Sequence, residues 1–231
     1  MVGSRHSPFS PRILLLGKTG VGKTSLIKCT FNVDYLEPDH FMPGDSNIED
    51  EIRIRLADGR LGYILHDSRG FEPGEFGNIR SVEGFINGRK GQARVEDKLH
   101  AIWYCIQIPH AGGRVFERGD EVLLKAGFGD IPIIVVFTQY DRLYDQTEYE
   151  MEEARLHGMT EPEIEVFVEE EAQKIFDELC YKPLQRVTSD LGGAKAQLEY
   201  ARVSHLERYK SNCEELVGKT DDVVRRHVWA S

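Results

Sequence analysis

RILLLGKTGVGKTS (residues 12–25) is the stretch that decides the fold: an apolar run followed by a glycine-rich turn. The run Arg12–Leu16 is short and uninterrupted, which predicts a buried strand. Residues 17–24 match the pattern G-x-x-x-x-G-K-[ST] at every fixed position, and we expect Ser25–Phe31 to be a helix. In such a turn, backbone N–H groups and the helix N-terminus surround a phosphate group. The stretch therefore predicts a strand, a phosphate-binding loop (the P-loop) and a helix in succession.

The residues of the P-loop have distinct expected roles. Lys23 would place its ammonium group against the β- and γ-phosphates of a nucleotide, and Thr24 would offer its hydroxyl oxygen to Mg²⁺. The remaining phosphate-binding candidates share the turn or the start of the helix: Lys18, Thr19, Gly20, Val21, Gly22 and Ser25. The alternative is a glycine turn with an incidental lysine, and the strand before the motif and the helix after it argue against that interpretation.

The composition is that of an ordinary soluble domain. The chain has 231 residues, of which 40% are apolar and 29% charged, enough for one domain with its own core. No apolar run approaches the roughly 20 residues that cross a bilayer, so we expect no transmembrane segment, no secretory signal and a cytoplasmic location. The four cysteines are widely spaced without a C-x-x-C pair, which predicts reduced thiols and no structural zinc.

The net charge of −10 is concentrated in one segment. Residues 147–180 contain twelve acidic and two basic side chains, and the rest of the chain is balanced. Such a run predicts a solvated helix face, with a docking surface for a basic partner as the alternative. The sequence has no basic footprint of the kind that binds nucleic acid, so we expect no nucleic-acid partner.

Strands alternate with helices along the chain, which predicts an α/β domain. We expect the first strand to be followed by strands at Glu51–Leu56, Gly62–His66, Ala101–Ile108, Ile131–Phe137 and Tyr200–Val203. We expect further helices at 81–87, 115–125, 163–179 and 216–228. The pattern predicts a three-layer P-loop NTPase fold: a mostly parallel sheet with one antiparallel hairpin strand and helices on both faces.

A D-x-x-G segment, Asp67-Ser68-Arg69-Gly70, follows the second strand of the expected hairpin. Its position places the Asp67 carboxylate at the carboxyl edge of the sheet, where ligands bind in such folds. Asp67 could hold Mg²⁺ through water, and the Gly70 N–H could meet a γ-phosphate because glycine allows close backbone approach. An ordinary turn after a strand is the alternative.

The segment Thr138-Gln139-Tyr140-Asp141 follows the buried strand at 131–137. A carboxylate at Asp141 can accept two hydrogen bonds from N1 and N2 of guanine, a pair of donors that adenine does not offer. Val203-Ser204, after the last short strand, fits a second loop that contacts the base. Both segments would meet the P-loop at the same edge of the sheet.

In this order the four segments resemble those of a G domain of the P-loop GTPases. The stretches GKTGVGKTS (17–25), LHAIWYCI (99–106) and VVFTQYD (135–141) are similar to the septin-, Era- and AIG1-like branch and to fungal proteins that contain a G domain. The resemblance implies GTP and GDP as ligands, Mg²⁺ as cofactor and slow GTP hydrolysis in a molecular switch. It implies a tail at 1–11 and a G domain at 12–231, with an acidic helical insertion at about 147–186.

The resemblance also assigns roles at the site, with four departures from the usual pattern. Lys23 and Gly70 would act in catalysis; Thr24 and Asp67 would serve Mg²⁺; Thr138, Gln139, Asp141 and Ser204 would surround the base. Gln139 replaces the usual lysine of N/T-K-x-D. No threonine lies between Thr30 and Thr138, so Ser46 is the candidate switch hydroxyl for Mg²⁺, with a plain turn serine as the alternative. Phe71 stands where Ras-like proteins have a catalytic glutamine, and the extra segments after Asp67 and Thr147 are longer than a minimal G domain needs.

Two other functional classes remain open at this point. One is a non-catalytic scaffold in which bound GTP or GDP stabilises a homodimer or a partner surface. The other is a P-loop ATPase or kinase, against which stand the position of Asp141 and the lack of an arginine-rich lid. A protein partner would bind through the switch regions or the acidic segment.

Overall fold

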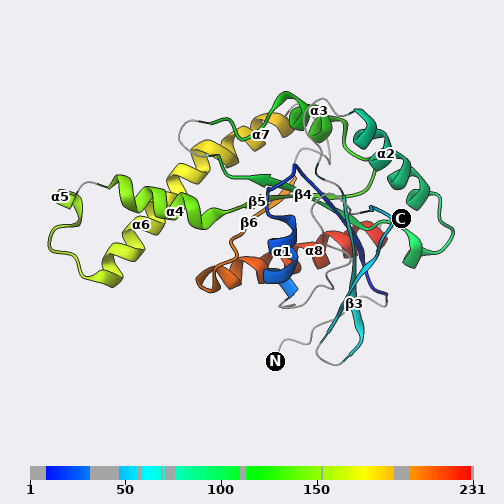
Figure 1. Ribbon diagram of the computed structural model, residues 1–231, viewed down its shortest axis with the longest axis horizontal. Coiled ribbons are helices and arrows are strands. Elements are labelled where there is room, and N and C mark those ends of the chain that lie inside the picture. The colour runs from blue at the N-terminus through cyan, green and yellow to red at the C-terminus, as the bar shows by residue number, and fades with distance from the viewer. Residues whose placement is uncertain are drawn as a thin grey trace.

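The computed structural model describes residues 9–31, 47–56, 59–68, 70, 76–109, 113–151, 153–189 and 198–229. A six-stranded sheet with the order β2-β3-β1-β4-β5-β6 runs through the centre of the molecule (Figure 1). Each strand that the sequence predicts is present, with bounds shifted by a few residues. The strands are β1 (Arg12–Leu16), β2 (Ile52–Arg55), β3 (Leu61–Asp67), β4 (Ala101–Gln107), β5 (Ile133–Thr138) and β6 (Glu199–Arg202).

The sheet is parallel except at one edge. Strand β1 pairs in parallel with β3 and β4, β4 with β5, and β5 with β6, whereas β2 is antiparallel to β3. The predicted hairpin and the mostly parallel sheet are therefore confirmed. The carboxyl ends of β1, β3, β4, β5 and β6 consequently lie at one edge of the sheet, where ligands bind in open α/β folds.

Helices connect the parallel strands, as crossover connections require. Among the described residues, no helix is long and apolar enough to cross a membrane. The α-helices are α1 (Lys23–Phe31), α2 (Phe76–Lys90), α3 (Arg118–Ala126), α4 (Tyr140–Glu150), α5 (Glu153–Leu156), α6 (Glu161–Phe176), α7 (Lys182–Ser189) and α8 (Lys210–Trp229). A π-helical turn, η3 (Asp177–Tyr181), joins α6 to α7, and short 3₁₀ turns lie at η2 (Val95–Asp97) and η5 (Glu207–Tyr209).

The central strands supply side chains to two separate cores, because successive residues of a strand point to opposite faces. Leu14 and Leu16 pack in one core with residues of α2, α3, α6 and α7. Ile13 and Leu15 pack in the other with residues of α1 and α8. Figure 1 shows α1 and α8 on one side of the sheet and α2 and α3 on the other. The predicted three-layer arrangement is therefore confirmed.

Helices α4 and α6 pack against each other and extend beyond the sheet, on the left of Figure 1. Helix α6 begins at a capping box, in which the Thr160 N–H donates to the Glu163 carboxylate at 2.7 Å. Further along α6, Val168, Ala172 and Phe176 are buried in the core beside the sheet. The acidic segment is thus helical, as predicted; its status as an insertion stays a prediction.

Two helix boundaries differ from the prediction for local reasons. Helix α3 begins at Arg118 and not at Val115, because Glu117 is its N-cap and the Glu117 N–H donates to the Asp120 carboxylate at 2.8 Å. Helix α2 spans more than the predicted 81–87, since packing of one face on the core outweighs the low helix propensity of its glycines.

The expectation of four reduced thiols is wrong for one pair. Cys29 on α1 and Cys213 on α8 form a disulfide across a sequence separation of 184 residues. Cys105 and Cys180 are free and buried. Spacing rules recognise only cysteines that are close in sequence, so they could not reveal a pair that the packing of two helices brings together.

Candidate nucleotide-binding site

The P-loop follows β1, and its backbone has the conformation that a phosphate-binding turn requires. Gly20 and Gly22 have φ angles of 79° and 94°, which side-chain-bearing residues rarely adopt. At Gly17, a Cβ atom would lie 2.5 Å from the Cys105 carbonyl oxygen on β4, so only glycine fits there. The motif glycines thus serve both the turn and its close packing on the sheet.

Lys23 begins α1 and its ammonium group lies across the loop. It is 8% exposed and donates hydrogen bonds to the carbonyl oxygens of Gly17 (3.1 Å) and Lys18 (3.3 Å). These contacts hold the charge where phosphate oxygens could replace the carbonyls. Thr24 follows in the first turn of α1, half-buried.

Lys18 and Thr19 have contacts outside the loop. The Lys18 ammonium pairs with the Glu117 carboxylate at 2.5 Å, which ties the P-loop to the start of α3. At Gly70 a Cβ atom would lie 2.3 Å from the Thr19 nitrogen, so the D-x-x-G segment touches the P-loop and only glycine fits. Ser46, the candidate switch hydroxyl, lies outside the described residues, as do Arg69 of the D-x-x-G segment and Phe71.

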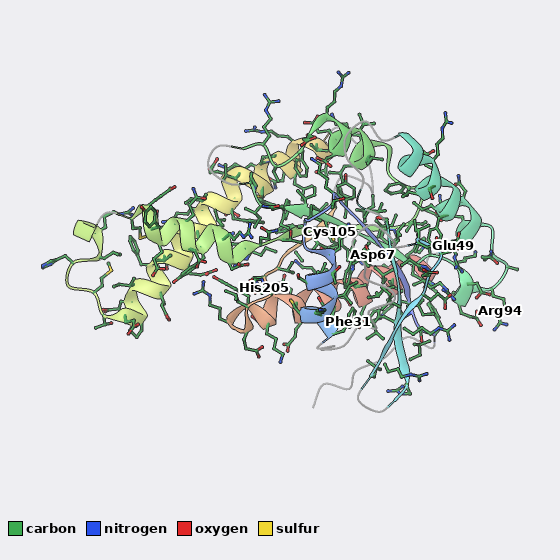
Figure 2. All side chains as sticks on the ribbon, viewed as in Figure 1. Phe31, Glu49, Asp67, Arg94, Cys105 and His205 are labelled. Atoms are coloured by element: carbon green, nitrogen blue, oxygen red, sulfur yellow. A yellow bond between two sulfur atoms is a disulfide. The ribbon has the colours of Figure 1, made fainter. Side chains whose placement is uncertain are left out.

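Asp67 ends β3 beside the P-loop strand, with its Cα opposite that of Leu15. Its Oδ1 atom is buried and has no hydrogen-bond partner among the described residues. Burial raises the pKa of Asp67 to about 6, and the positive charge of Lys23 opposes that rise. Figure 2 shows Asp67 and Cys105 near the same end of α1, with Phe31 at the other end.

These donors fit a magnesium ion that also binds phosphates. A buried carboxylate oxygen without a partner is costly unless a cation or donor meets it, and Thr24, in the P-loop, offers a hydroxyl oxygen as a second ligand. In the described part of the chain, no group of three or more His, Cys, Asp or Glu side chains could hold a metal alone. Few protein ligands, completed by substrate phosphates and water, are typical of Mg²⁺.

Thr138 ends β5 and braces the P-loop. Its hydroxyl donates to the Val21 carbonyl oxygen at 2.6 Å. The next residue, Gln139, has a φ angle of 63°, a left-handed conformation, and it caps α4. The structure thus places Thr138 against the phosphate loop, while Gln139 and Asp141 follow at the helix start.

A cavity of about 180 Å³ lies where these segments meet. Asp141 is 6% exposed, and neither its Oδ1 atom nor the Oε1 atom of Gln139 has a hydrogen-bond partner among the described residues. Two buried acceptors without donors suit a ligand that carries N–H groups. The cavity is lined by Gly20, Gly22, Ser25, Leu26, Cys29, Thr138, Gln139, Asp141, Arg142, Val203, Ser204 and His205.

The loop after β6 closes this cavity from the other side. The Val203 N–H donates to the Phe137 carbonyl oxygen at 2.8 Å, and the Tyr140 N–H donates to the Val203 carbonyl oxygen at 3.1 Å. The Ser204 hydroxyl oxygen accepts from the Leu206 N–H at 3.1 Å, so the serine side chain shapes the turn. Backbone bonds therefore set the loop beside the segment that holds Asp141.

Sequence reasoning missed several residues of the cavity wall. Cys29 lies one helical turn after Ser25 on α1, so its i,i+4 spacing from the P-loop could have placed it on the same face. His205 and Arg142 directly follow predicted site residues, and only the identity of their neighbours hinted at them. In Figure 2 His205 lies at the N-terminal end of α8, beside α1.

Comparisons with known proteins give limited matches. No family model matches the chain. Translocase of chloroplast 90 from Arabidopsis thaliana is 43% identical over 65 residues, which cover 28% of this chain and 8% of that protein.

Two solved structures align with most of the chain at low identity. One is the translation elongation factor SelB from Methanococcus maripaludis in complex with the GTP analogue GppNHp. It aligns with a TM-score of 0.46 and 14% identity, and the alignment covers 93% of this chain and 34% of SelB. The other is a mutation variant of SsGBP, with a TM-score of 0.47, 16% identity, and coverage of 94% and 56%. The strand order and the P-loop at its carboxyl edge support a P-loop GTPase fold for this chain, and the septin-, Era- and AIG1-like branch stays a prediction.

Proposed function

We propose that this protein binds GTP and GDP together with Mg²⁺ and hydrolyses GTP slowly as a molecular switch. The observation that supports this most directly is the cavity beside the P-loop: Asp141 lines it, and one carboxylate oxygen of Asp141 is buried without a hydrogen-bond partner among the described residues. Guanine presents two N–H donors on one edge, and a carboxylate accepts both. A cytoplasmic location stays a prediction.

Each residue has a defined task in this proposal. The Lys23 ammonium exchanges its two carbonyl partners for β- and γ-phosphate oxygens, and the backbone N–H groups of the P-loop surround the β-phosphate. Thr24 and Asp67 would hold Mg²⁺, which when bound supplies positive charge to the phosphate oxygens. Thr138 links the segment at residues 138–141, which contains Asp141, to the phosphate loop through its hydrogen bond to Val21.

Hydrolysis requires a group that orients water, and the residues that we assign to the site do not supply one. Lys23 and the Gly70 N–H can stabilise negative charge on the γ-phosphate, but neither positions a nucleophile. Phe71, at the position of a catalytic glutamine, has no hydrogen-bonding side-chain atom. We therefore propose a low intrinsic rate.

A non-catalytic scaffold is the second candidate, favoured by the same lack of a water-orienting side chain at Phe71. In that case bound nucleotide stabilises a homodimer or a protein partner at the switch regions or the acidic helices. Single-turnover hydrolysis of bound GTP separates the two: conversion to GDP supports the switch, and intact GTP after many hours supports the scaffold.

The test of guanine recognition is competition for labelled GDP, with Asp141→Ala as the variant. Losing the carboxylate that accepts the hydrogen bonds from guanine costs about 1.5–3 kcal/mol, which weakens GDP binding by roughly 10- to 100-fold. Asp145→Ala, an exposed change one turn later on α4, is the matched control and should bind normally. Equal competition by ATP and GTP, or unchanged affinity in Asp141→Ala, would refute the guanine assignment.

A further inference from the structure

The disulfide between α1 and α8 lies in the wall of the nucleotide cavity. Cys29 is half-buried and lines the cavity, and its sulfur is bonded to that of Cys213. Cys213 is 1% exposed, within the core on the α1–α8 side of the sheet. A reagent in solution therefore meets this bond from the Cys29 side, where the nucleotide would bind.

Both sulfur atoms also contact the loop that closes the cavity. The Ser204 carbonyl oxygen lies 3.3 Å from the Cys29 sulfur and 3.6 Å from the Cys213 sulfur. Ser204 is 3% exposed and follows Val203, whose backbone is bonded to the base segment. The pair thus joins the helix of the phosphate loop, the C-terminal helix and the base loop at one point.

We propose that Cys29 and Cys213 form a reversible redox modification site that controls how tightly the cavity holds its nucleotide; this rests on the proposed function. A dithiol reductant breaks the S–S bond, becomes a disulfide itself and leaves two protein thiols, so two electrons and two protons pass to the pair. The oxidised bond fixes α1 against α8 beside Ser204. After reduction, only non-covalent packing holds the helices, and the loop that carries Ser204 loses the fixed pair of sulfur atoms that it contacts.

The two states of the pair should differ in two measurable ways. Reduction loosens the wall of the cavity, so bound nucleotide should dissociate faster. If the oxidised form binds nucleotide more tightly, bound nucleotide stabilises the oxidised form by the same free energy. The nucleotide also covers Cys29 and so hinders attack by the reductant. Reduction should therefore be slower when the cavity is filled.

The experiment compares oxidised and reduced wild-type protein. Alkylation with N-ethylmaleimide in denaturant, read by mass, should label two of the four cysteines in protein prepared without reductant, and all four after dithiothreitol. Fluorescent GDP should leave the reduced form at least about fivefold faster, the lower end of typical coupling. Excess GDP should slow the appearance of the two new thiols.

Cysteine variants distinguish the effect of breaking this disulfide from other effects of the reductant. Cys29→Ser and Cys213→Ser should each release GDP at the reduced rate with or without dithiothreitol. Cys180→Ser, which removes a buried thiol on η3 away from the cavity, should keep the wild-type response.

Several outcomes would overturn the inference. Four labelled cysteines without reductant show that the bond is absent. Equal release from two forms that both bind GDP overturns the redox site alone. If neither form binds GDP or GTP, the proposed function fails, and the proposed redox control of nucleotide release fails with it.

Discussion

Lys23 and Asp67 differ in how protein groups satisfy their buried polar atoms. The Lys23 ammonium is hydrogen-bonded to two carbonyl oxygens of its own loop, whereas the Asp67 carboxylate keeps a buried oxygen without a partner among the described residues. Protein carbonyl groups therefore compensate the buried charge of the lysine, whereas one buried oxygen of the aspartate is not compensated in this way. Each should respond to mutation accordingly.

Lys23→Ala should abolish tight GTP binding. Two charge-assisted hydrogen bonds to phosphate, each worth about 1.5–3 kcal/mol, correspond to a loss of roughly two orders of magnitude or more. Isothermal titration with GTP measures the change, and a circular dichroism spectrum shows that the variant is folded. Lys28→Ala, an exposed change on the same helix, is the control. Normal affinity in a folded Lys23→Ala protein would refute the assignment of the P-loop.

Asp67→Asn should stabilise the nucleotide-free protein at pH 7. The folded pKa of Asp67, about 6, lies above the ordinary value of 3.8, so the folded state prefers the protonated group. At pH 7 the charged form therefore costs stability, on the order of 3 kcal/mol, and the variant removes that cost. As the pH falls through 6 towards 3.8, wild-type Asp67 gains its proton and the advantage of the variant should shrink.

Urea unfolding of both proteins at pH 7 and pH 5 checks this sign. Asp50→Asn, an exposed carboxylate, should show no such pH-dependent difference. In the same samples Asp67→Asn should lose the Mg²⁺ dependence of GDP binding. An advantage of equal size at both pH values would contradict the assignment of the raised pKa to this residue.

At the scale of elements, strands β1, β4 and β5 were predictable because they are continuous apolar runs buried on both faces. The P-loop was predictable because its chemistry is local in sequence. The extent of α2 was not, since its glycines weaken the local signal and packing of Phe85 and Ile86 decides the outcome. The Lys18–Glu117 and Cys29–Cys213 pairs depend on how distant elements meet, which no local pattern encodes.

The hydrogen bond from the Thr138 hydroxyl on β5 to Val21 couples the base segment to the phosphate loop. Thr138→Val keeps the shape but leaves the Val21 carbonyl without this donor, at a cost of about 1–3 kcal/mol. We expect faster GDP release, measured with a fluorescent analogue. Thr147→Val is the control, because among the described residues this buried hydroxyl donates to the Leu143 carbonyl oxygen within α4. Equal release from both variants would mean that the bond serves stability alone.

At the scale of the molecule, we expect turnover to depend on other molecules, because Phe71 has no side-chain atom that could orient water. The turnover number at saturating GTP should be low in dilute protein. A second copy that inserts an arginine would raise it by roughly 10³–10⁵, and the rise would follow protein concentration. A low, flat rate points to a separate activator or to the scaffold. Fast turnover in a dilute, demonstrably monomeric sample would contradict the prediction.

The acidic helices have a consequence for how a nucleotide arrives. Helix α4 starts next to Asp141 and leads into the segment that carries the whole net charge of −10. GTP is a polyanion, so we expect the negative charge of this segment to oppose its approach, within the roughly 8–10 Å over which salt leaves such a field unscreened at physiological ionic strength. Added salt should therefore speed nucleotide capture, the opposite of what happens at sites that attract their ligands electrostatically. If the proposed function holds, we expect short-range contacts in the cavity, and not long-range attraction, to determine nucleotide capture.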